Sequence, residues 1–174
     1  MRKTTLALLT LTLLAAPAAA SAGPLLELSL GSGYRAGLGD AERIPTNVEL
    51  TVGYGLAGML KLEVGALAGL GDVKKSIHDQ RAGTMTWDIR PMVVVSPPLF
   101  PLYLRGIASF SDLGQKPVKP TFGGALGIGF GLFGVGVFAE AGAVQHRYVV
   151  AVPTGTIIKD GWQVEGRVGV SLGG

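Results

Sequence analysis

The stretch Leu25-Leu26-Glu27-Leu28-Ser29-Leu30-Gly31 sets the pattern that decides the fold, and Asn47-Val48-Glu49-Leu50-Thr51-Val52-Gly53-Tyr54 repeats it. In both segments a large apolar residue alternates with a polar residue or a glycine. Successive side chains of a β-strand point to opposite faces of a sheet, so each segment carries one apolar face and one polar or glycine face. The same period of two recurs as far as Leu172. It predicts an all-β protein.

The period and its interruptions predict eight antiparallel strands in one domain that covers residues 23–174. The strands are expected at residues 25–35, 47–56, 60–70, 84–95, 102–110, 122–132, 135–146 and 161–172. Each is close to the roughly 9–11 residues that a tilted strand needs to cross a bilayer. Short connections at 57–59, 96–101 and 133–134 alternate with longer ones at 36–46, 71–83, 111–121 and 147–160. This alternation is typical of up-and-down transmembrane barrels. A bulge or local distortion is expected at Pro91, because proline has no N–H to donate.

Residues 1–22 have the features of a secretory signal peptide. Arg2 and Lys3 provide positive charge, residues 6–16 are apolar, and Ala20-Ser21-Ala22 is a small-residue cleavage site. Pro17 interrupts the apolar run, which is then short for a membrane-spanning helix. We therefore expect an exported protein that begins at Gly23.

The composition excludes several functional classes. Removal of Arg2 and Lys3 from the 15 basic residues leaves 13 against 12 acidic residues, so the charge does not predict a nucleic-acid partner. There is no cysteine, and hence neither disulfide nor thiolate chemistry. Charged residues make up 16% of the chain and hydrophobic residues 48%, yet no segment of the exported chain has about 20 consecutive apolar residues. A hydrophobic chain without spanning helices can cross a bilayer as a closed sheet.

The polar face is expected to point into the barrel. It is rich in glycine, which gives no solubility but suits the narrow interior of an eight-stranded barrel. Its charges are sparse and of both signs, and enclosed charges must be paired. We expect a network that joins Glu63, Glu140 and Glu165 to Arg90, Arg105 and Arg167, as a plug of ion pairs or, alternatively, as a pore lining. The predicted lumen charges are Glu27, Glu49, Lys61, Glu63, Asp88, Arg90, Arg105, Glu140, Glu165 and Arg167.

Aromatic residues fall near the strand ends. Two girdles are expected, because such rings favour the boundary between membrane and water. The residues predicted for the outer girdle are Tyr34, Trp87, Phe110, Phe122, Tyr148 and Trp162, and those for the periplasmic girdle are Tyr54, Phe100, Phe130 and Phe133.

Motifs for catalysis, cofactors or metals are weak. The segment 31–36 matches a dinucleotide fingerprint, but Gly37, Gly39 and Pro45 prevent the helix that this motif requires. His78 is expected in a solvated loop, and His146 near the outer end of its strand has no adjacent serine to activate. No spacing of histidines and carboxylates suggests zinc. We expect no enzyme, no cofactor and no metal.

The segments 25–30 and 164–172, with the alternation between them, resemble the small bacterial outer-membrane β-barrel family, which includes outer-membrane protein X and the membrane domain of outer-membrane protein A. The chain differs from the family in ending Leu172-Gly173-Gly174 instead of an aromatic residue. The resemblance implies an integral barrel of the outer membrane, with its lipids and the barrel insertion machinery as partners. A structural, adhesive or surface-protective role of the long outer loops is expected, with an unidentified loop partner. Two alternatives are a narrow pore for small solutes and a secreted, lipocalin-like barrel that binds an apolar ligand.

Overall fold

The computed structural model describes residues 22–36, 43–56, 58–74, 81–97, 100–111 and 119–173. Apart from Ala22, the predicted signal peptide lies outside these residues, and so does His78. The strands are β1 (Gly23–Ala36), β2 (Asn47–Leu56), β3 (Leu60–Gly69), β4 (Asp72–Lys74), β5 (Arg81–Met85), β6 (Asp88–Val95), β7 (Leu102–Ser111), β8 (Pro120–Leu132), β9 (Val135–Val152) and β10 (Gly155–Gly173).

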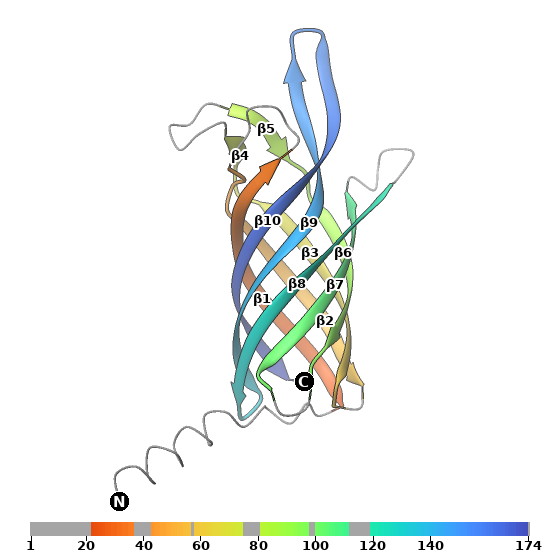
Figure 1. The fold of residues 1–174 in the computed structure, drawn as a ribbon, viewed down its shortest axis with the longest axis vertical. Coiled ribbons are helices and arrows are strands. Elements are labelled where there is room, and N and C mark those ends of the chain that lie inside the picture. Colours follow the sequence, from red (N-terminus) through yellow and green to blue (C-terminus); the bar gives the residue numbers. More distant parts are fainter. Residues whose placement is uncertain are drawn as a thin grey trace, which may run out of the picture.

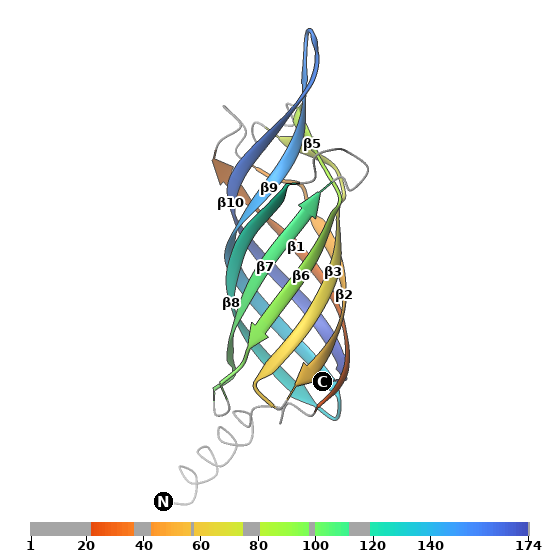
Figure 2. The same ribbon diagram turned by 90° about the vertical axis from the view of Figure 1, so that its right-hand side faces the viewer.

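Eight of these strands form a closed antiparallel barrel, as the sequence predicts. The order is β10-β1-β2-β3-β6-β7-β8-β9, and pairing of β10 with β9 closes the cylinder. β4 and β5 extend the sheet from β9 at one end of the barrel. Figures 1 and 2 show the tilted strands, with the C-terminus at the end that is opposite to the long β9–β10 hairpin. No helix in the described ranges is long and apolar enough to span a membrane.

The alternation of side chains places the apolar face outside. Leu28, Leu50, Val64 and Val168 are each about half exposed on the outer wall. Their sequence neighbours Glu27, Glu49 and Glu63 are buried inside the barrel. This arrangement contradicts the lipocalin-like alternative, in which the apolar face would point inward.

The prediction of a long loop between the last two barrel strands is wrong. Residues 147–160 were expected to connect two strands, but β9 continues to Val152 and β10 already begins at Gly155. The two strands stay paired from Val152 opposite Gly155 down to the barrel. Figure 1 shows this hairpin as the part of the molecule that projects farthest from the barrel. Uncharged β-branched residues such as Val149, Val150 and Ile157 favour strands over an irregular loop.

The distortion at Pro91 is a gap in the ladder and not a bulge. Ile89 lies opposite Phe110 and Met92 lies opposite Ile107, so the register of β6 against β7 is the same on both sides of the proline. Between these two pairs, the ladder of β6 with β7 is interrupted at Arg90 and Pro91, which agrees with the missing N–H of proline.

The short turn between β8 and β9 has a conformation that explains its sequence. Phe133 has a φ of 53° and Gly134 a φ of 78°. Two successive residues with positive φ form the tight hairpin turn that matches the twist of the strands, and glycine favours it. The turn lies beside the C-terminal end of β10, where the Gly173 N–H donates to the Gly134 carbonyl at 2.8 Å, and its Phe133 side chain is exposed.

Inward-facing glycines allow close approach within the barrel. A Cβ on Gly33 would lie 2.1 Å from the carbonyl oxygen of Val164, which is backbone and has little freedom to move. We expect Gly33→Ala to lower the free energy of unfolding by about 1–3 kcal/mol. Gly166→Ala is the matched control. Gly166 lies on the outer face of the neighbouring strand β10, and a Cβ there would have no heavy atom closer than 4.0 Å. Urea unfolding in detergent should separate the two variants, and equal stabilities would contradict the packing argument.

Candidate functional site

A network of ion pairs fills the middle of the barrel, and Arg105 is one of its centres. Its guanidinium lies 2.8 Å from Glu27, 3.5 Å from Glu63 and 3.3 Å from Glu140. The Tyr103 hydroxyl donates to Glu140 at 2.9 Å. β7 contributes Arg105, while the three carboxylates come from β1, β3 and β9. The group therefore joins opposite walls of the barrel.

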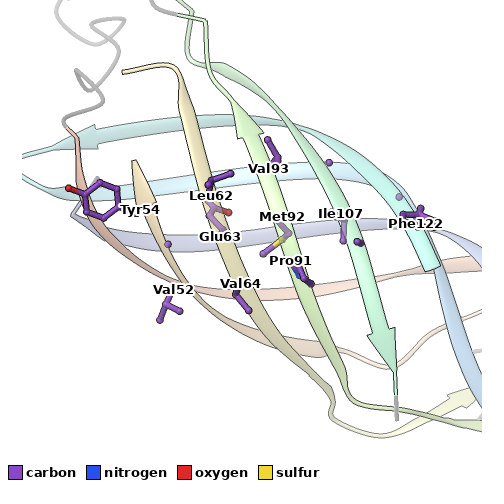
Figure 3. Close-up of a pocket in the computed structure, with 14 residues that line it drawn as sticks. Val52, Tyr54, Leu62, Glu63, Val64, Pro91, Met92, Val93, Ile107 and Phe122 are labelled. Carbon is purple, nitrogen blue, oxygen red and sulfur yellow. The ribbon is translucent and has the colours of Figure 1, made fainter. Parts of the chain in front are cut away.

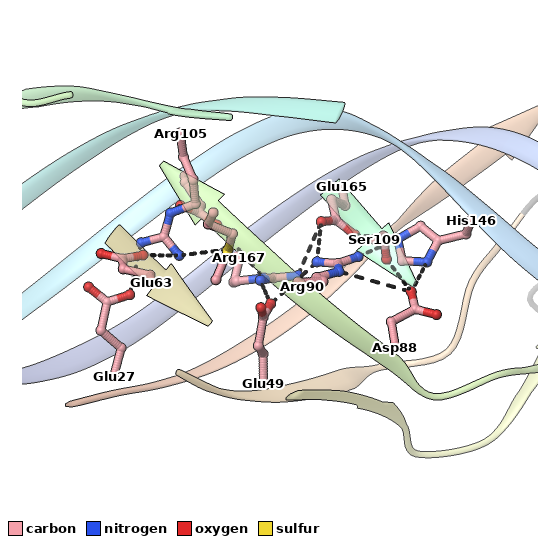
Figure 4. A network of polar contacts seen from close by, with 12 residues as sticks. Glu27, Glu49, Glu63, Asp88, Arg90, Arg105, Ser109, His146, Glu165 and Arg167 are labelled. Atoms are coloured by element: carbon pink, nitrogen blue, oxygen red, sulfur yellow. Dashed lines mark hydrogen bonds and ion pairs between the residues drawn. The ribbon is translucent and has the colours of Figure 1, made fainter. Parts of the chain in front are cut away.

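Arg90 is the second centre. It lies 3.3 Å from both Glu49 and Glu165, and 4.0 Å from Asp88. Arg167 connects the two centres, because it contacts Glu49 and Glu165 as well as Glu140 at 3.9 Å. Figure 4 shows Arg105, Arg167 and Arg90 with the neighbouring glutamates Glu63, Glu49 and Glu165.

Nine of the ten predicted lumen charges lie in this network. The exception is Lys61, which is on the inward-facing side of β3 near its short-turn end and is partly exposed. No ion pair between described residues includes Lys61. Its flexible stem allows the ammonium group to stay in water, so this charge needs no carboxylate partner.

His146 belongs to the network, although the sequence did not assign it there. Its Nδ1 lies 2.9 Å from Asp88 Oδ2, and its Nε2 contacts Arg90 Nη2. The same Nε2 lies 3.5 Å from Glu165, so the imidazole lies between two carboxylates and one guanidinium. Ser109 donates to Asp88 at 3.0 Å, and Ser111 donates to its other oxygen.

This geometry does not form a nucleophile and base pair. In a catalytic triad the serine lies at the histidine nitrogen opposite to the carboxylate. Here Arg90 occupies that position, and both seryl hydroxyls are bonded to Asp88. The residues Asp88, His146, Ser109 and Ser111 are also enclosed, with exposed fractions of at most 2%. Among the described residues there is no group of three or more histidines, cysteines or carboxylates suited to a metal ion.

Apolar residues close the lumen on both sides of the network, which the sequence did not predict. Toward the outer end, one cluster contains Ile44, Leu67, Val73, Met85 and Tyr148. Toward the short turns, Val94, Tyr103 and Phe138 form another. The polar network is therefore shielded from water in both directions. Period-two patterns do not reveal Leu67, Val94, Tyr103, Phe138 and Tyr148, since these residues occupy inward positions that elsewhere hold charges.

Tyr148 does not belong to the outer girdle. Its side chain is fully buried, and its hydroxyl contacts Gln163 inside the barrel. The Arg35 guanidinium lies 4.1 Å from the ring centroid, in cation–π geometry. Because the strand continues beyond residue 146, Tyr148 keeps the inward orientation of His146 and not the outward one of a rim residue.

The other predicted girdle residues lie on the outer wall. Phe110 is only partly exposed there, between neighbouring strands. Those with large exposed side chains are Tyr34, Trp87, Phe122 and Trp162 near the outer strand ends, and Tyr54, Phe100, Phe130 and Phe133 near the short-turn ends.

A shallow groove marks the outer wall over β3, β6 and β7. Its lining includes Val64, Pro91, Val93 and Ala108, and Gly106 leaves space between them. Figure 3 shows these strands and the side chains around the groove. The outward-facing side chains are apolar, so the groove is continuous with the aliphatic belt and provides no charged group on its outer surface to orient a ligand.

Solved structures support the class of fold. No family model and no curated protein matches the sequence. The crystal structure of Neisserial surface protein A aligns with 86% of this chain and 96% of that chain, at a TM-score of 0.56 and 11% identity. The solid-state NMR structure of outer membrane protein AlkL in lipid bilayers covers 87% of this chain and 90% of that chain, at a TM-score of 0.45 and 7% identity.

The chain thus has the fold of the small eight-stranded outer-membrane β-barrels, as its resemblance to that family implies. The first alignment and the closed eight-stranded topology carry this conclusion. The second alignment is too distant to add to it.

Proposed function

We propose that the chain is an integral barrel of the bacterial outer membrane without catalytic activity. Its role is structural, adhesive or surface-protective and is exerted by the elements at its outer end. The observation that carries the proposal is the reversed polarity of the barrel, with Leu50 and Val64 half exposed outside while Glu49 and Glu63 are buried inside. Such a wall suits hydrocarbon and not water.

The same reasoning defines the partners. The aliphatic belt would contact outer-membrane lipids, and the flanking rings would lie at the two interfaces. Delivery to that membrane requires the predicted signal peptide and the barrel insertion machinery. The closed lumen supports a scaffold over a pore, because ion pairs and two apolar clusters fill the interior.

Fractionation of Gram-negative cells that express the full chain tests the proposal. The protein is expected in the outer membrane, and unboiled samples should migrate on gels as a compact, heat-modifiable band. Partition of the protein into the aqueous phase without detergent would overturn the proposal.

Conductance across a planar bilayer distinguishes the scaffold from the pore. We expect no conductance steps above the lipid background from the purified protein. Reproducible steps that disappear when the protein is omitted would contradict the closed lumen and favour transport of small solutes.

A further inference from the structure

The β9–β10 hairpin continues beyond the barrel as an uncharged ribbon. Its arms pair from Val149 opposite Ile158 to Val152 opposite Gly155, and no residue from 149 to 158 is charged. Figures 1 and 2 show that the ribbon projects past the other outer elements. An element in this position is the first part of the described structure to meet another surface.

Both faces of the ribbon are aliphatic. Val150 lies opposite Ile157 on one face, and Val149 lies opposite Ile158 on the other. The side chains of Ile157 and Ile158 are 40% and 47% exposed. In the β9 arm, Val150 packs against the apolar cluster at the mouth of the barrel. The side chains of the β10 arm are therefore more exposed than those of the β9 arm.

The outer edge of β10 lacks a neighbouring strand in the described part of the chain. Pairing of β1 with β10 ends at Trp162, so residues 155–161 pair with β9 alone. An edge of this kind presents backbone N–H and C=O groups that can add another strand.

These features select the kind of partner. Insertion into hydrocarbon would leave the edge groups of β10 without hydrogen-bond partners, which is costly. A flat surface would cover only one of the two aliphatic faces. A further β-strand satisfies the edge and extends both faces at once, so an extended polypeptide fits best.

We propose that this strand is β10 of a second copy of the chain, paired antiparallel about a two-fold axis at Ile158. Each copy supplies the same edge, as a two-fold interface requires. Ile158 then faces Ile158 of the second copy, and no residue from 149 to 158 is charged, so the aliphatic part of the edge brings no like charges together.

The direction of pairing determines where the copies reside. Barrels in one membrane point the same way, whereas antiparallel strands related by a two-fold axis point in opposite directions. The pairing therefore joins barrels in two facing membranes. This inference rests on the proposed function and selects the adhesive role from the three that it names. A single contact of a few residues is weak, but many copies on each surface give avidity.

Clustering of vesicles that contain the purified protein tests this inference. Two populations with donor and acceptor dyes should cluster when both carry the wild-type chain. Vesicles with Ile158→Lys on both sides, or with Ile158→Glu on both sides, should lose clustering through like-charge repulsion. Mixing the Lys population with the Glu population should restore it. Lys119→Glu is the matched control, because it changes charge at an exposed residue near the outer rim outside the ribbon.

The outcomes separate the inference from the proposed function. Heat-modifiable wild-type protein that does not cluster vesicles overturns the inference alone. Clustering with protein-free vesicles overturns it in favour of a lipid partner, and clustering that both charge variants retain overturns the role of this edge. Failure of the mixed charge variants to restore clustering overturns self-pairing. A chain that does not enter vesicles overturns the inference and the proposed function together.

Discussion

Replacement of Arg105 by methionine is expected to lower the free energy of unfolding by about 3–5 kcal/mol. The change retains an unbranched apolar stem but removes the guanidinium that lies within 3.5 Å of Glu27, Glu63 and Glu140. Three carboxyl groups would then remain buried without their shared partner. Urea titration of the folded protein in detergent, with heat-modifiability as a second readout, measures the loss.

Lys61→Met provides the control for this experiment. Lys61 is also a cation on the inward face, but it is partly exposed and lies outside the network. Its replacement should change stability by less than about 1 kcal/mol. Arg105→Met with stability equal to that of the control would show that the network does not hold the barrel together.

Leu50→Arg is expected to destabilise the protein in lipid by about 2–4 kcal/mol, because it places a charge on the outer wall in the middle of β2. A soluble barrel would tolerate the same change, since an exposed arginine in water costs little. Unfolding from lipid vesicles in denaturant gives the free energy. The result therefore depends on the surrounding medium and not only on the fold.

The matched control is Leu132→Arg, the same substitution on the same outer surface. Leu132 is the last residue of β8 and precedes the short turn, so it lies near the expected membrane interface. We expect a cost of about 0–1 kcal/mol there. Equal and small effects at both positions would indicate that water covers the outer wall.

The sequence predicted the barrel because its wall depends on a local pattern. Alternation around Leu28, Leu50 and Val64 determines which side chains face outward, and any one-residue shift would bury them. Short turns such as Phe133–Gly134 have their own local signal. These features need no knowledge of distant contacts.

The outer elements were harder to predict. Residues 147–160 contain Pro153 and Gly155, which suggested a loop. The hairpin instead needs only two residues outside its strands, and the aliphatic residues on either side pair with each other. The extension carries Tyr148 into the interior, so one error in the strand end produced the error in the girdle.

The composition of the interior could be predicted from local pattern, but its contacts depend on residues that are distant in the sequence. Alternation and charge on the polar face identified the glutamates and arginines as a set. They did not show which arginine contacts which carboxylate. His146 and Asp88 are 58 positions apart, and only the closed sheet brings them to 2.9 Å. Ile44 and Val73 were not predicted to close the mouth, because they lie outside the main strands.

Spin labelling in lipid vesicles tests the orientation of the wall most directly. The chain has no cysteine, so Val168→Cys introduces a single attachment point on the outer face. We predict that the label collides frequently with oxygen, which concentrates in hydrocarbon, and rarely with a water-soluble nickel chelate. Frequent collisions with the nickel chelate, or shielding from both reagents, would contradict a barrel whose aliphatic face meets lipid.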